Sequence, residues 1–151
     1  MGLICRDFIV TYVLAMIGLL AVSLGVEALF QTDIGSAVNV VPQIVAALVA
    51  GQRHGKRTGI RPNSSFSWTA AFWMTSISVG LSLVLATGFI IYMGPGDAAP
   101  MFEFLTTEWH WFVGILAIFI VIYLLITRYF FGLGAKQGAQ ASPHADSEIF
   151  R

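Results

Sequence analysis

The sequence predicts an all-α integral membrane protein of one domain, a bundle of four membrane-spanning helices with both termini in the cytoplasm. Composition supports this fold class, because 57% of the 151 residues are hydrophobic and 11% are charged, whereas soluble domains contain about 25% charged residues. Four long apolar runs and a one-sided distribution of Lys and Arg are the other two observations. Together they exclude a disordered chain and an ordinary soluble domain. The single cysteine excludes a disulfide-stabilised secreted module.

The apolar runs predict the four spans, at residues 8–30, 34–51, 66–93 and 111–131. Each is long enough or nearly long enough to cross a hydrocarbon core of about 30 Å, which takes roughly 20 helical residues. The first is too long for the apolar part of a signal peptide. The second is the weakest, because it contains two amides and a proline. The third is uncharged, and Asn63 or Ser64 is expected to cap it.

The fourth run is the most apolar of the set and completes a membrane domain at residues 1–134. The residues that follow are small and polar, so they predict a flexible cytoplasmic tail at residues 135–151.

Orientation follows from the basic residues, which all fall on one side: Arg6, Arg53, Lys56, Arg57, Arg61, Arg128, Lys136 and Arg151. Because Lys and Arg favour the cytoplasmic side, both termini are predicted to lie there.

Small residues predict which helices pack together, because lipid provides no hydrophobic drive for helix association. The first three runs contain small or hydroxyl residues at helical spacing: Ala21 and Gly25; Ala46, Ala47, Ala50 and Gly51; Ala71, Thr75, Ser78 and Ser82; and Ser76 with Gly80. The fourth run has almost none. We therefore expect the first three helices to pack closely and the fourth to face lipid.

A polar cluster inside the membrane is the sharpest candidate site. Glu27 lies near the outer end of the first run, and an acidic residue within a span is costly and often functional. Asn39 and Gln43 share one face of the second run, and Pro42 between them predicts a helix kink. The three polar residues form either an ion or proton site or a set of interhelical hydrogen bonds. Glu27 can also be an interfacial carboxylate without a special role, because it lies near the end of its span.

The basic connection between the second and third runs predicts contact with the membrane surface. Its four cationic residues are Arg53, Lys56, Arg57 and Arg61. Such a segment sets topology and also attracts anionic lipid headgroups, by about 1 kcal/mol per basic residue. No metal ion, cofactor or nucleic acid is expected, and none of the three histidines lies in mid-membrane, as a bis-histidine haem site would need.

The stretch from Asn39 to Trp68 contains a proline-centred run, NVVPQIVAALVAG, a basic connection and then RPNSSFSW. With four spans and both ends inside, it resembles the ABZJ-type family of small bacterial four-helix inner-membrane proteins. The resemblance covers most of the chain up to about residue 134. It implies the fold and a multi-pass location in the bacterial inner membrane, and it implies no activity.

Two functional hypotheses follow. The favoured one is a non-enzymatic accessory, assembly or immunity-type protein that acts through helix–helix contacts, with the bilayer and a membrane protein or a second copy as partners. The alternative is a small oligomeric transporter or channel that uses Glu27, Asn39 and Gln43 to bind a cation or proton. An enzyme is not expected, because no nucleophile, base and oxyanion site can be assembled from these residues.

Overall fold

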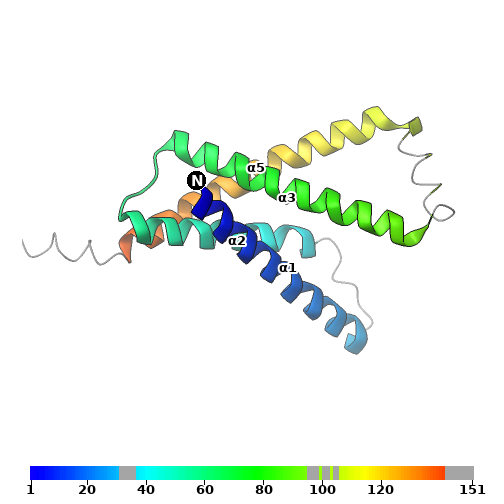
Figure 1. The fold of residues 1–151 in the computed structure, drawn as a ribbon, viewed down its shortest axis with the longest axis horizontal. Coiled ribbons are helices and arrows are strands. Elements are labelled where there is room, and N and C mark those ends of the chain that lie inside the picture. Colours follow the sequence, from blue (N-terminus) through cyan, green and yellow to red (C-terminus); the bar gives the residue numbers. More distant parts are fainter. Residues whose placement is uncertain (31–36, 95–98, 100–102, 104–105, 142–151) are drawn as a thin grey trace, which may run out of the picture.

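The computed structural model describes residues 1–30, 37–94, 99, 103 and 106–141, without the side chains of residues 27–30, 37–39 and 93. The long elements within these ranges are all helices (Figure 1): α1 (Gly2–Phe30), α2 (Ala37–Thr58), α3 (Ser64–Met93) and α5 (Trp109–Gln140). The all-α prediction is therefore confirmed for the described part of the chain.

Three of these helices are long and apolar enough to cross a membrane. Their apolar stretches cover Gly2–Val26, Ser64–Tyr92 and Trp109–Gln140. The predicted second span falls on α2, which is not among the three, because amides and the basic residues of its last turns lower its hydropathy. The described helices thus support three candidate spans, and a crossing by α2 stays a prediction.

Helix boundaries confirm one expectation and correct another. The predicted cap of the third helix is Asn63, whose Oδ1 accepts a hydrogen bond from the Phe66 N–H at 2.8 Å. The predicted tail was wrong at its start, because α5 continues to Gln140, past the expected boundary at residue 134. Helix α2 covers this extension and buries Ala135 and Gly138. The rest of the predicted tail, residues 142–151, lies outside the described residues.

The packed core lies at one end of the helices, near the N-terminus (Figure 1). It includes Phe8 of α1, Met74 of α3 and Phe131 of α5, which form one cluster with the alanines of α2. At the other end the helices diverge, and most apolar side chains beyond Leu14 in α1 and beyond Leu83 in α3 are exposed or half-buried. The packing therefore holds the helices together over part of their length.

The most extensive helix contact joins α2 to α5 through glycines on both helices. A Cβ atom on Gly55 would lie 2.7 Å from the Ala139 nitrogen, and one on Gly138 would lie 2.8 Å from the Gln52 carbonyl carbon. Real Cβ atoms do not approach so closely, so the two backbones touch where no side chain fits. Gly51 and Gly134 make the same kind of contact.

This contact overturns the expectation that the first three helices pack closely while the fourth faces lipid. Helix α2 packs mainly on α5 and then on α1, and it contacts α3 only slightly. The reason is positional: the glycines with which the fourth helix contacts α2 lie beyond residue 131, where the predicted span ended. The first half of α5 is apolar and exposed, as expected, but its second half is at the centre of the fold.

Candidate functional site

A buried polar cluster joins three helices at the centre of the packed region. Gln43 of α2 donates from Nε2 to the Thr127 hydroxyl of α5 at 2.6 Å, and its Oε1 accepts from the Ser78 hydroxyl of α3 at 2.5 Å. The Thr75 hydroxyl of α3 lies 3.5 Å from the Thr127 hydroxyl. All four side chains are buried. The cluster is uncharged, and it holds the three helices in register.

The hydroxyls in this cluster are fixed by their own helices. The Ser78 hydroxyl lies 2.9 Å from the Met74 carbonyl, and the Thr127 hydroxyl donates to the Tyr123 carbonyl at 2.7 Å. Serine and threonine often bond in this way to the carbonyl four residues earlier in a helix. Thr127 therefore presents its oxygen to the Gln43 amide as an acceptor, which explains why an amide can be buried there.

The predicted cluster of Glu27, Asn39 and Gln43 is only partly visible in the structure. Glu27 and Asn39 lie on α1 and α2, but their side chains are outside the described residues. Gln43 is buried as a member of a different set, with partners on α3 and α5. Pro42 is buried inside α2, which continues as a helix on both sides of it. The association with Glu27 and the kink at Pro42 stay predictions.

A buried carboxylate that the sequence analysis missed lies at the packed end of the molecule. Asp7 of α1 is 5% exposed, and its Oδ1 accepts a hydrogen bond from Arg53 Nη1 at 3.2 Å. Arg57 Nη1 lies 2.7 Å from Oδ2 and completes an ion-paired triad between α1 and α2. The signal was present in the sequence: Asp7 is an acidic residue that follows Arg6 and directly precedes an apolar run.

This triad changes the interpretation of the predicted lipid-contact residues. Arg53, Lys56 and Arg57 lie on the last turns of α2, and the two arginines face Asp7 while remaining nearly half exposed. Arg61 follows α2 and lines a separate cavity together with residues of α3 and α5. Contact of the four residues with anionic lipid stays a prediction, but they do not form one continuous basic loop.

His54 lies beside this triad, and its pKa is shifted by packing and by nearby charges. Its ring stacks on Phe66, with 5.0 Å between ring centroids, and lies 5.9 Å from Phe131. Partial burial lowers the pKa of His54 below its ordinary value of 6.5, and the positive charges of the N-terminus and Arg57 lower it further. His54 is therefore neutral near pH 7.

Acidification is expected to destabilise the fold through His54. The unfolded chain takes up this proton near pH 6.5, whereas the folded chain does so only at lower pH. Neutral His54 therefore contributes fully to the free energy of unfolding above pH 6.5. This contribution declines as the pH falls toward the pKa of His54 in the folded chain. Thermal unfolding in detergent between about pH 7.5 and about pH 5.5 measures this slope. His54→Phe keeps the ring contacts and is expected to flatten the dependence of stability on pH. An unchanged pH dependence in this variant would show that His54 does not cause it.

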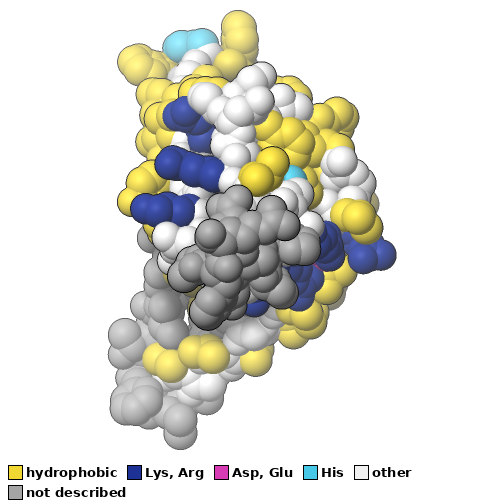
Figure 2. Space-filling model, turned by 90° about the vertical axis from the view of Figure 1, so that its left-hand side faces the viewer, with side chains coloured by type: hydrophobic (Ala, Val, Ile, Leu, Met, Phe, Trp, Pro, Cys, Tyr) yellow, Lys and Arg dark blue, Asp and Glu magenta, His cyan; other side chains and the backbone are white. Residues whose placement is uncertain are grey.

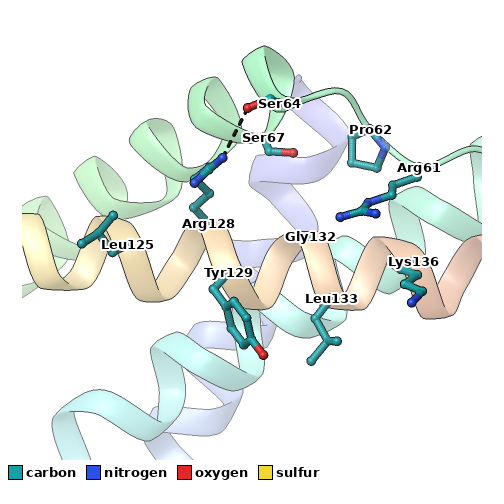
Figure 3. A pocket seen from close by; sticks show the side chains of 10 residues that line it. All are labelled: Arg61, Pro62, Ser64, Ser67, Leu125, Arg128, Tyr129, Gly132, Leu133 and Lys136. Atoms are coloured by element: carbon teal, nitrogen blue, oxygen red, sulfur yellow. Dashed lines mark hydrogen bonds between the residues drawn. The ribbon is translucent and has the colours of Figure 1, made fainter.

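A basic cavity lies between the start of α3 and the second half of α5 (Figure 3). Its volume is about 520 Å³, and its cationic lining residues are Arg61, Arg128 and Lys136. The Arg128 guanidinium donates to the Ser64 hydroxyl at 3.3 Å and stacks over the Trp68 ring at 4.3 Å from its centroid. Lys and Arg side chains gather in two groups on this end of the molecule, as Figure 2 shows.

No protein-family model, curated protein or solved structure matches this chain. The resemblance to the ABZJ-type family therefore stays a prediction.

Proposed function

We propose that the protein is a non-enzymatic, multi-pass protein of the bacterial inner membrane that acts through helix–helix contacts as an accessory, assembly or immunity-type protein. The observation that supports this function is a set of glycines and a serine on exposed helix faces. Small residues allow close approach of helices in lipid, where packing rather than hydrophobicity drives association.

The glycines on the described helices fall into two groups. Those of the α2–α5 contact have backbone atoms of the opposite helix where a Cβ would lie. A second group, on α1, α3 and α5, has nothing within 4 Å of that position: Gly2, Gly18, Gly25, Gly80, Gly88, Gly114 and Gly132. The first group shows that glycines of this chain mark close helix contacts. The glycines of the second group also lie on apolar helices, but no other helix of the described part of the chain packs against them.

Helix α3 carries the clearest unoccupied face. Ser76 and Gly80 are one turn apart and exposed, while Thr75 and Ser78 point into the polar cluster. Large exposed apolar residues border this small-residue face: Phe72, Trp73, Leu83 and Val84. A shallow groove between large apolar side chains is the surface that a second membrane helix packs against.

Photo-crosslinking in native membranes tests this proposal. In a Cys5→Ser background, Ser76→Cys and Ser82→Cys are matched single-cysteine variants, because both serines are exposed on α3 but lie on different faces. After labelling with benzophenone-maleimide, Ser76→Cys is expected to give one discrete crosslinked protein, and Ser82→Cys much less. A foreign partner recovered in stoichiometric amount by intact-mass analysis supports the proposal. Equal, diffuse crosslinking of both variants would contradict it.

A second candidate function is a small oligomeric transporter or channel for a cation or proton. The buried amide and hydroxyls around Gln43 favour it, because polar groups inside a membrane protein often line an ion path. The first proposal is preferred because the oxygen and the nitrogen of the Gln43 amide are both engaged by neighbouring helices. Ion flux in vesicles that disappears in Glu27→Gln, from a protein that crosslinks only to itself, would favour the second.

A further inference from the structure

We propose that the basic cavity between α3 and α5 binds the phosphate of an anionic phospholipid, with the acyl chains along the apolar surface of α5. This inference does not depend on the proposed function, because it concerns a different face of the molecule. Three features support it: the positive charge of the cavity, the N-terminus of α3 that borders the cavity, and the apolar surface of α5 beside it.

The cavity has three cations and no acidic lining residue. Arg61 and Lys136 are exposed, and Arg128 is half-buried. Within the described residues, no ion pair involves any of the three, whereas Arg53 and Arg57 are paired with Asp7. Three cations around one hollow repel one another, so an anion that enters between them is favoured by all three.

The start of α3 adds hydrogen-bond donors to this charge. The Asn63 side chain caps the Phe66 N–H, and the Ser67 N–H bonds to the Asn63 carbonyl. The N–H groups of Ser64 and Ser65, in the first turn, have no partner inside the helix. Ser64 lines the cavity. Helix starts of this kind bind phosphate, because free N–H groups and the helix dipole both favour negative charge.

The cationic side chains approach the cavity from two directions. Figure 3 shows Arg128 rising from α5 toward Ser64, while Arg61 reaches from the α2–α3 connection toward the space beside Gly132. The stack of Arg128 on Trp68 restricts its guanidinium further. Gly132 has nothing within 4 Å of a Cβ position, so the space between these cations stays open.

The surroundings favour a lipid over a soluble phosphate compound. Leu125, Tyr129 and Leu133 line the same cavity from α5. From Leu125 toward the N-terminus of α5, the exposed surface is almost entirely apolar. A ligand with a phosphate at the cations and hydrocarbon along α5 satisfies both surfaces. The cavity also lies at the end of two candidate membrane spans, where headgroups would be.

Native mass spectrometry of the full chain in detergent tests this proposal, with phosphatidylglycerol, phosphatidylcholine and glycerol phosphate as probes. The cavity variant is Arg61→Gln with Lys136→Gln, which leaves the Arg128–Trp68 stack intact. The control variant is Arg6→Gln with Lys56→Gln, which removes the same charge from outside the cavity. Thermal unfolding of each variant checks that the fold is retained.

The parent protein is expected to bind phosphatidylglycerol in preference to phosphatidylcholine, in a one-to-one complex. The cavity variant is expected to lose roughly tenfold or more in affinity, because two of the three cations that surround the phosphate are removed. The control is expected to lose much less. Equal losses of phosphatidylglycerol affinity in both variants would overturn the assignment of the phosphate site to this cavity. The absence of a preference for phosphatidylglycerol over phosphatidylcholine would overturn it as well. Glycerol phosphate that binds as tightly as the lipid would overturn the lipid assignment.

Discussion

Gly134→Ala is expected to lower the free energy of unfolding by at least ~2 kcal/mol, because overpacking a tight contact forces the backbone to move. A Cβ atom at this position would meet the Leu48 carbonyl oxygen and lie 3.0 Å from its carbon and 3.1 Å from the Gln52 nitrogen. These are backbone atoms of α2 that cannot rotate away. The whole α2–α5 contact must therefore widen, which also stretches the bond between Gln43 and Thr127.

The matched control for this variant is Gly132→Ala, two residues earlier in the same helix. Nothing lies within 4 Å of its Cβ position. Alanine is the better helix former by roughly 1 kcal/mol, so this change is expected to be neutral or stabilising. Unfolding in detergent, followed by tryptophan fluorescence or circular dichroism, measures both. Equal stabilities of the two variants would show that α2 and α5 do not touch through their backbones.

Asp7→Asn is expected to lower the free energy of unfolding by about 1–3 kcal/mol, with the N-terminal part of α1 released from α2. Loss of one partner from a buried ion pair costs about 3–5 kcal/mol. The effect here is smaller because the side chains of Arg53 and Arg57 are 48% and 43% exposed and can be solvated. Asparagine keeps the shape of the side chain, so the loss of stability measures the contribution of the Asp7 charge.

A double-mutant cycle isolates this ion pair. Asp7→Asn and Arg57→Gln are measured singly and together, by unfolding in detergent. Because each single variant already breaks the same contact, the double variant is expected to be less destabilised than the sum of the two. Strict additivity would show that Asp7 and Arg57 do not interact. Glu108→Gln, at the start of α5, is the control for the loss of a less buried carboxylate.

The positions of the long apolar helices and the cap of α3 could be predicted from the sequence, because both depend on residues that are close together in the chain. Long apolar runs require helices wherever backbone groups are in lipid, and this requirement predicted α1, α3 and α5. Asn63 precedes the third run directly, and capping needs only a side-chain oxygen within reach of its own next turn. The sequence also indicated that Gln43 needs a hydrogen-bond partner, since it is an amide in an apolar helix; in the structure its partners are Thr127 and Ser78.

The partners of these residues were decided only by the tertiary structure. Glycine spacing permits close contact but does not say which helices meet, and Gly134 and Gly138 were overlooked because hydropathy falls before the helix ends. Asp7 is buried only because α2 brings Arg53 and Arg57 to it from a distant part of the chain. The basic cavity likewise combines Arg61 with Arg128 and Lys136. Hydropathy and capping act over one helix, whereas charge pairing and backbone contact depend on distances that exist only after the helices have packed.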